Sequence, residues 1–170
     1  RSSELYDLAL AVRMNEVVLA HKLDLLHVHY AIPHATSAWI AREMLANTRP
    51  DIKVLTTLHG TDITIVGQDP SFFPITKFSI EKSDGLSAVS HYLREETMSA
   101  FGCTGCRIEE IPNFIDPVVY DRARYAPELR DQLDAGRKVL IHVSNFRPVK
   151  RVRDVIGIYA RVAREIPSVL

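Results

Sequence analysis

Apolar and polar positions along this chain follow two alternating patterns. Over 5–23, apolar side chains recur three or four positions apart with charged residues between them, which predicts an amphipathic helix capped by Ser2 or Ser3. Further helices are predicted over 33–46, 72–82, 91–101 and 149–166, with a short one from Pro127. Compact apolar runs between them predict strands over 24–30, 52–57, 85–89, 108–111 and 138–143.

This alternation of strands and helices predicts an α/β fold in which helices cover both faces of a parallel sheet. Ligands bind such sheets beyond the carboxyl ends of the strands. We therefore expect functional groups in the segments that follow the strands.

One such segment, 56–62, follows the apolar run 52–55 and reads Thr-Thr-Leu-His-Gly-Thr-Asp. It gathers an imidazole, hydroxyls and a carboxylate at one strand end, which suits a hydroxyl-rich ligand such as a sugar. His59 can hydrogen-bond a sugar hydroxyl or a developing charge without a metal, although a strand-end histidine can also simply cap a loop. Gly60 allows the backbone to approach a ligand, and Asp62 either orients His59 or caps the loop.

A second segment, 144–151, places cations after another predicted strand. Arg147 offers a bidentate fork and Lys150 a point charge, and the helix predicted from Val149 adds its N-terminal amides. These groups suit a diphosphate, so the two segments together predict a site with sugar on one side and phosphate on the other. The alternative for the second segment is a solvated, basic helix start.

Two prolines fix the backbone over 111–117, and an aperiodic stretch follows before a new strand and helix begin. We place a domain boundary here, so that residues 1–113 form most of a first domain and residues 114–170 form a hinge and the beginning of a second. One strand and one helix cannot bury a core by themselves. Because position 1 is not Met, we expect an internal piece of a longer protein that is inactive alone.

Composition narrows the classes of partner. The 170 residues include 21 Lys and Arg and 21 Asp and Glu, so a broad basic surface for nucleic acid or membranes is not expected. No apolar run approaches the roughly 18 residues of a membrane span, and the N-terminus has no signal-peptide pattern. We expect a cytoplasmic protein without stable membrane insertion; whether it forms a homo-oligomer stays open.

Three other features of the sequence bear on whether the protein uses a metal ion or redox chemistry. Cys103 and Cys106 form a Cys-x-x-Cys pair, but it follows a predicted helix end and has no second pair, so we interpret it as a turn that holds two thiols. His27 and His29 share one face of a predicted strand, and without a third ligand we interpret them as buried or capping histidines. No Asp-x-Asp motif occurs, and we expect no metal and no cofactor.

The order and spacing of three motifs resemble the retaining GT-B glycosyltransferases of family 4. These motifs are His59-Gly60-Thr61-Asp62, the segment Ile111-Pro112-Asn113 with Asp116, and Ser144 with Arg147 and Lys150. The resemblance implies two Rossmann-like domains that face each other across a cleft, with the acceptor bound by the first and the nucleotide-sugar mostly by the second. The expected fold is therefore a Rossmann-like parallel sheet.

The segments 29–35, 58–64 and 143–151 carry the resemblance further. They imply a bacterial enzyme that transfers N-acetylglucosamine from a UDP-sugar donor to a small dicarboxylate, L-malate, with retention, as the first step of bacillithiol biosynthesis. Two other functions stay open. One is a family 4 transferase with a different acceptor, and the other is a non-catalytic Rossmann-like binding module.

The resemblance also assigns roles to single residues. It implies that His59 is catalytic and lies near the transferred sugar, and that Arg147 and Lys150 bind the donor diphosphate. The family usually has an arginine two positions before Arg147, where this chain has Asn145, so Arg147 takes that role here. Candidate acceptor contacts at strand ends are Tyr30, Thr57, Ser90 and His91, although Ser90 also suits a simple N-cap.

Overall fold

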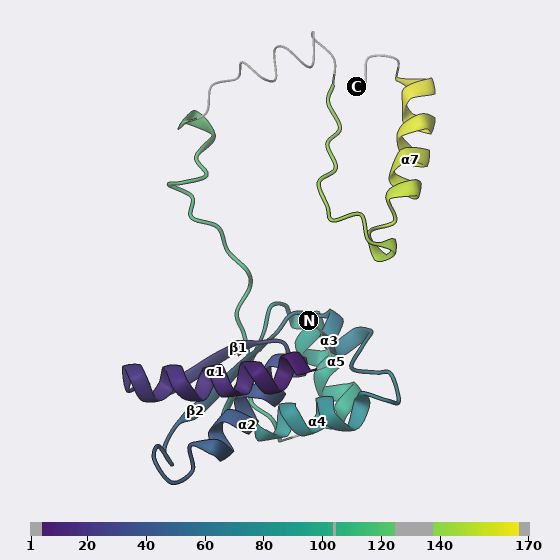
Figure 1. The fold of residues 1–170 in the computed structure, drawn as a ribbon. Coiled ribbons are helices and arrows are strands. Elements are labelled where there is room, and N and C mark those ends of the chain that lie inside the picture. The colour runs from purple at the N-terminus through teal and green to yellow at the C-terminus, as the bar shows by residue number, and fades with distance from the viewer. Residues whose placement is uncertain (1–4, 104, 125–137, 167–170) are drawn as a thin grey trace. The chain divides into compact units, whose positions relative to one another are not determined.

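A computed structural model of the protein describes residues 5–103, 105–124 and 138–166 (Figure 1). The chain divides into two compact units, Arg1–Phe114 (unit 1) and Ile115–Leu170 (unit 2). Each unit is described by itself.

Unit 1 is an α/β unit with a four-stranded parallel sheet, which confirms the predicted fold class. The strands pair in the order β1 (Leu25–His29), β2 (Lys53–Leu58), β3 (Gly85–Ala88) and β4 (Ile108–Glu110). The helices are α1 (Tyr6–His21), α2 (Thr36–Met44), α3 (Thr61–Thr64), α4 (Phe73–Lys82) and α5 (His91–Phe101). An irregular π-type turn, η2 (Ala31–Ala35), precedes α2, which therefore begins three residues later than predicted.

The helices of unit 1 cover one face of the sheet, which corrects the prediction that both faces are covered. On β1, Leu26 and Val28 are buried while His27 and His29 are exposed. Both hydrophobic clusters of unit 1 lie on the face of Leu26 and Val28. The strand order explains this arrangement, because right-handed crossovers that always step in the same direction place successive helices on the same face.

Two packed clusters form the core of unit 1. One joins α1 and α2 to β1 and β2, and the other joins α3, α4 and α5 to β2, β3 and β4. The ring of Phe101 is 1% exposed and stacks on Phe73 with ring centroids 4.9 Å apart. The single tryptophan, Trp39, meets the ring of Phe78 edge-on, which links α2 to α4.

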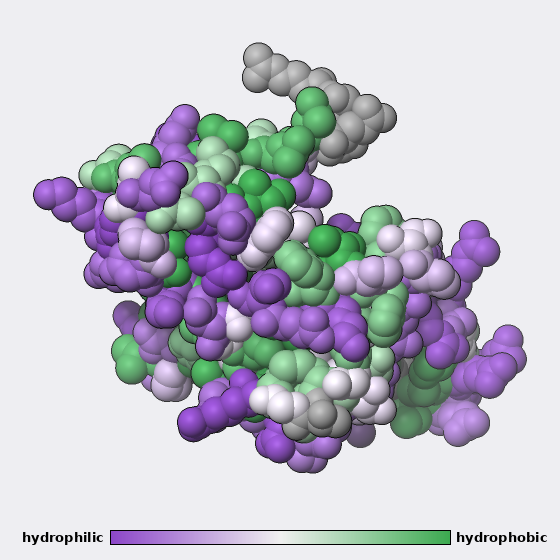
Figure 2. All heavy atoms as spheres, turned by 90° about the horizontal axis from the view of Figure 1, so that it is seen from below, coloured by the Kyte–Doolittle hydropathy of each residue, from purple (hydrophilic) through white to green (hydrophobic). Residues whose placement is uncertain are grey.

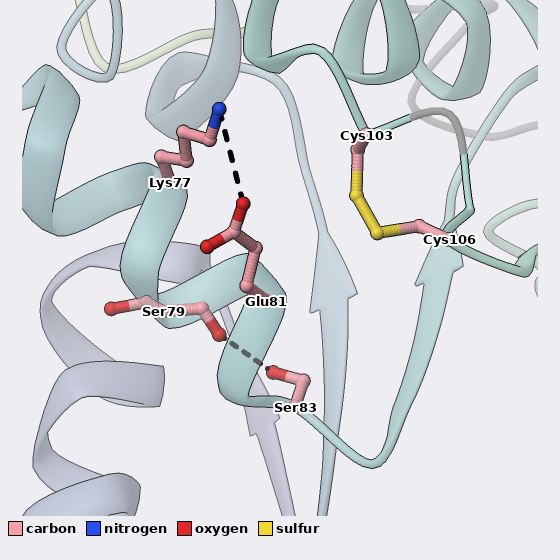
Figure 3. The surroundings of a disulfide bond; sticks show 6 residues. All are labelled: Lys77, Ser79, Glu81, Ser83, Cys103 and Cys106. Carbon is pink, nitrogen blue, oxygen red and sulfur yellow. Dashed lines mark hydrogen bonds and ion pairs between the residues drawn. A yellow bond between two sulfur atoms is a disulfide. The ribbon is translucent and has the colours of Figure 1, made fainter.

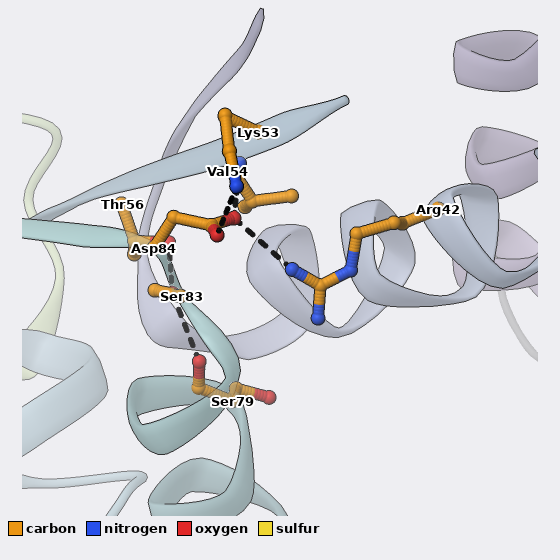
Figure 4. Close-up of polar contacts among 7 residues, drawn as sticks. All are labelled: Arg42, Lys53, Val54, Thr56, Ser79, Ser83 and Asp84. Carbon is orange, nitrogen blue, oxygen red and sulfur yellow. Dashed lines mark hydrogen bonds and ion pairs between the residues drawn. The ribbon is translucent and has the colours of Figure 1, made fainter. Parts of the chain in front are cut away.

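Asp84 fastens the amino ends of β2 and β3 (Figure 4). Its carboxylate accepts the backbone N–H of Val54 at 2.9 Å and pairs with Arg42 at 3.0 Å, while Lys53 lies 3.5 Å away. Beside it, Ser83 donates a hydrogen bond to the carbonyl of Ser79 in α4. This end of the sheet is thus closed by structural contacts, opposite to the end where ligands are expected.

The structure joins Cys103 and Cys106 in a disulfide (Figure 3). The pair lies in the connection from α5 to β4, as predicted, but as a disulfide and not as two thiols. Cys103 is buried and belongs to the second hydrophobic cluster of unit 1. The bond therefore closes the turn against the core.

Unit 2 contains the short turns η3 (Arg122–Arg124) and η4 (Pro148–Lys150) and the helix α7 (Val152–Glu165). Among the described residues the predicted strand over 138–143 is not formed; only Lys138 makes a β-bridge. The helix begins at Val152 and not at Val149, since a separate 3₁₀ turn occupies 148–150. The helix predicted from Pro127 lies outside the described residues.

On the face shown in Figure 2, hydrophilic residues predominate and hydrophobic residues form small separate groups. Within the described ranges, no helix combines the length and apolar character needed to cross a membrane.

Candidate functional site

Parallel pairing brings the carboxyl ends of β1 and β2 together, with His29 opposite Thr57. His59 follows β2, and its Nε2 lies 2.7 Å from Nδ1 of His29. The ring of Tyr30 also contacts the ring of His59, with centroids 5.0 Å apart. The imidazole singled out from the sequence thus belongs to an aromatic cluster at the strand ends and is half-buried.

A chain of polar side chains crosses three strands beneath this cluster. Nε2 of His27 lies 2.8 Å from Oγ1 of Thr57, and the same hydroxyl lies 2.7 Å from Oγ of Ser87. Thr57 is only 7% exposed. Its hydroxyl already contacts His27 and Ser87, so an acceptor substrate that reaches Thr57 would also lie close to those two side chains.

Asp62 is a buried carboxylate, 3% exposed, that binds backbone amides. Its oxygens accept N–H groups from Ala31 at 2.8 Å, Gly60 at 3.0 Å and His59 at 3.3 Å. It therefore ties the loop after β2 to the turn after β1, which corresponds to the loop-capping alternative. Gly60 has φ +120°, a conformation that other residues rarely adopt, so this loop needs glycine.

A cavity of about 330 Å³ opens on the sheet face that the helices leave uncovered. The sheet supplies imidazole and hydroxyl groups as well as apolar side chains, and the chain after β4 forms another wall. Its lining consists of His27, His29, Leu55, Thr57, His59, Ser87, Val89 and the residues from Ile111 to Phe114. Such a mixture of apolar walls and a few polar groups is typical of a small-molecule site.

Two imidazoles of the site, those of His27 and His59, have lowered pKa values. Loss of hydration lowers the pKa of His59 below its ordinary value, the neighbouring His29 lowers it further, and the carboxylate of Asp62 opposes both effects. Loss of hydration and then His29 also lower the pKa of His27. The neutral forms of His27 and His59, which can both donate and accept a hydrogen bond, are thereby favoured.

The predicted acceptor contacts divide into two groups. Tyr30 and Thr57 lie within the histidine cluster, and Tyr30 has a φ of +80°, an uncommon backbone conformation for a tyrosine. Ser90 instead caps α5 by accepting the N–H of Leu93, and His91 lies 3.5 Å from Glu110 on the surface. Of these four residues, only Thr57 lines the cavity.

In unit 2, Arg147 precedes η4 and lines a surface hollow together with Arg151 and Arg153. Arg151 pairs with Asp154 at 2.5 Å. Lys150 ends η4 and does not line this hollow, so the structure brings only Arg147 of the predicted pair to it. Within the described residues, neither Arg147 nor Lys150 forms an ion pair.

The described part of the chain contains no group of three or more His, Cys, Asp or Glu side chains arranged to hold a metal ion. The residues that the sequence interpretation undervalued are His29, Ser87 and the cavity wall from Ile111 to Phe114. For His29 a signal existed, because its alternation with His27 placed both on one strand face. For Ser87 and the wall, only the pairing of the strands reveals the proximity.

Comparison with known proteins adds two findings. Residues 1–119 match the family model described as Glycosyltransferase Family 4. Over 167 residues, 97% of the chain, the sequence is 46% identical to a Bacillus anthracis protein named N-acetyl-alpha-D-glucosaminyl L-malate synthase. The chain spans 42% of the length of that relative.

Proposed function

The chain belongs to glycosyltransferase family 4, and from this membership we propose that the protein transfers N-acetylglucosamine from UDP-GlcNAc to the hydroxyl of L-malate with retention. The similarity to the malate synthase supports the choice of donor and acceptor. The observation that carries a catalytic role is the placement of His59, fixed in a cluster of hydrogen-bonding rings beside a cavity. We assign the reaction to the cytoplasm, as the first step of bacillithiol biosynthesis.

The proposed reaction exchanges one bond for another at the anomeric carbon. The bond from this carbon to the diphosphate oxygen breaks, and the malate oxygen bonds to the same carbon from the same face. The malate hydroxyl proton passes to the departing diphosphate. Because negative charge grows on that diphosphate, cationic side chains placed beside it lower the barrier.

Unit 1 and unit 2 supply different groups to this reaction. His59 steadies the sugar, with Asp62 and Gly60 shaping the loop that carries it. Thr57, which lines the cavity, and Tyr30, whose ring contacts His59, meet the acceptor. Ser90 and His91 stay weaker candidates because they lie outside both the cavity lining and the histidine cluster. Arg147 and Lys150 hold the diphosphate, in place of the metal ion that other transferases use.

The test is product formation by the intact protein, measured by mass spectrometry with UDP-GlcNAc and L-malate. N-acetylglucosaminyl malate with the α configuration is the expected product. Transfer to another acceptor but not to malate would assign a different family 4 activity. UDP-sugar binding without any transfer would support the non-catalytic module instead.

His59→Ala tests the catalytic role within the same assay. We expect kcat to fall about a hundredfold while UDP still binds, because an interaction made mainly in the transition state is lost. His21→Ala is the matched control, since His21 is exposed at the end of α1. Unchanged turnover of His59→Ala would remove this role.

Arg147→Ala and Lys150→Ala test the donor side. We expect each variant to weaken UDP binding about tenfold or more through loss of a charge-assisted contact. Arg161→Ala, an exposed arginine on α7, is the control. If the control weakens binding equally, the effect is that of general positive charge.

A further inference from the structure

His29 contacts His59 through one defined pair of ring nitrogens. Nδ1 of His29 lies 2.7 Å from Nε2 of His59, and the ring centroids are 4.9 Å apart. A hydrogen bond between two imidazoles needs a proton on one facing nitrogen and a lone pair on the other. The two rings therefore hold complementary tautomers, and the bond is lost when both facing nitrogens carry protons.

Regular structure anchors His29 more firmly than His59. The residue ends β1 opposite Thr57, and the N–H of Tyr30, which follows it, donates to the carbonyl of Thr57 at 2.8 Å. Nδ1–H of His34 donates to the carbonyl of His29 at 2.5 Å. His59, by contrast, lies in the loop after β2, so His29 is the fixed member of the pair.

Because His29 occupies Nε2 of His59, only Nδ1 of His59 stays available to a ligand. No hydrogen bond to that Nδ1 is made by any residue that the structure describes. A neighbour that binds one ring nitrogen of a histidine fixes both its tautomer and its ring orientation.

We propose that His29 is a positioning residue for His59: it holds Nε2 of His59 and so selects the tautomer and turns Nδ1 toward the transferred sugar. This proposal rests on the proposed function in one respect only, namely that the ligand of Nδ1 is a sugar. The pairing of the two rings is tested independently of that function.

Other titratable groups face the pair from each neighbouring element. His27 lies beside His29 on β1 with ring centroids 4.8 Å apart, Tyr30 and His34 follow β1, and Asp62 lies in α3. Lost hydration is the main cause of the lowered pKa of His59, and a positive charge on His29 lowers this pKa further. A neutral side chain at position 29 is therefore expected to raise the pKa of His59 toward its ordinary value.

The chain offers closely matched variants. In His29→Asn a polar side-chain atom stands where Nδ1 stood, bonded to the same Cγ. The leucine of His29→Leu has nearly the same shape as the asparagine of His29→Asn, but its side chain forms no hydrogen bond. His29→Gln moves its amide one bond further, to the position of Nε2, and so tests whether the nitrogen position matters.

The first readout is kinetic and uses the intact protein. We expect His29→Leu to lower kcat about tenfold or more while the KM for UDP-GlcNAc changes by less than about twofold. His29→Asn should recover most of the loss and His29→Gln should not, while His21→Leu should have no effect. Equal kcat in all four variants would refute the positioning role.

The second readout is the tautomer and pKa of His59, measured by ¹⁵N NMR of the imidazole rings across a pH titration. We expect one tautomer in the wild type and in His29→Asn, and mixed tautomers in His29→Leu and His29→Gln. If His29→Leu does not fold, the Asn and Gln variants give the same comparison. The same single tautomer in every variant would overturn the proposal, whereas absence of sugar transfer in the wild type would overturn only the proposed function.

Discussion

Unit 1 holds its candidate groups in a hydrogen-bonded network above a packed core, whereas none of the described residues of unit 2 is buried. His59 has ring and backbone partners from three segments, namely β1, the turn after it and α3. Arg147 and Lys150 lie in and beside a turn whose backbone hydrogen bonds, among the described residues, join positions three apart. In unit 1 the fold itself therefore sets the position of a functional side chain, while in unit 2 the local backbone sets it.

The largest expected effect compares one apolar residue from each unit. Phe101→Ala removes a ring that is 1% exposed and stacked on Phe73, and should lower the free energy of unfolding of unit 1 by about 3–5 kcal/mol. Ile158→Ala in α7 removes a side chain that is 62% exposed and should change stability by less than about 0.5 kcal/mol.

Trp39 fluorescence during urea unfolding reports on unit 1, because this single tryptophan lies in α2. Hydrogen exchange of the α7 amides reports on unit 2. Strong loss of protection in Ile158→Ala would break the comparison, since it would reveal packing of α7 that its exposure does not indicate. Phe101→Leu, a milder change, serves if Phe101→Ala does not fold.

The second prediction compares two aspartates that both bind backbone amides. Asp62→Ala leaves three N–H groups near a buried site without their charged acceptor and should cost about 3 kcal/mol. Asp116→Ala removes an exposed acceptor of the Val118 and Val119 amides and should cost about 1 kcal/mol or less. Unfolding of each variant, followed by Trp39 fluorescence and amide exchange, measures the difference, and equal costs would contradict it.

The sequence predicted the elements of unit 1 well because their patterns are local. The boundaries of α5 agree with the prediction, since Ser90 caps the helix and its apolar side chains keep helical spacing. The positions of His59 and Asp62 at the end of β2 also followed from the local pattern. The prediction that helices cover both faces of the sheet was wrong, because the face on which a helix lies depends on the order in which the strands pair.

What the sequence could not provide are contacts between distant segments. His29 and His59 lie thirty positions apart, and so do Thr57 and Ser87, and only the parallel register brings each pair within hydrogen-bond distance. In unit 2 the apolar run over 138–143 has the composition of a strand, but among the described residues only Lys138 makes a β-bridge. The sequence pattern of a strand is local, whereas its pairing depends on residues elsewhere in the chain.

A smaller effect is expected at the helix starts. Ser90→Ala should cost unit 1 about 1 kcal/mol, because the hydroxyl of Ser90 accepts the N–H of Leu93. Arg151 precedes α7 in a left-handed conformation and gives no side-chain cap, so Arg151→Ala should cost less than about 0.5 kcal/mol through its surface ion pair. Urea unfolding and amide exchange measure the two costs.

Ser90→Asp separates capping from acceptor binding. Aspartate caps a helix as well as serine does, so stability should be retained. A carboxylate at this position would repel malate, so the KM for malate should rise if Ser90 contacts the acceptor. An unchanged KM would leave Ser90 as a helix cap alone.

The smallest expected effect is a dependence of the stability of unit 1 on pH. The pKa values of His27 and His59 are lowered in the folded protein, chiefly by lost hydration, so the unfolded chain binds more protons near and below the ordinary value of 6.5. Stability should therefore fall as pH drops through about 6.5 and level off below the folded pKa values.

His27→Gln keeps a polar atom near the position of Nε2, opposite Thr57, but does not titrate, and should flatten the fall. Urea unfolding followed by Trp39 fluorescence between about pH 8 and pH 5 measures the slope. A slope of the opposite sign, or one that His27→Gln leaves unchanged, would show that the histidine cluster does not link protonation to the packing of unit 1.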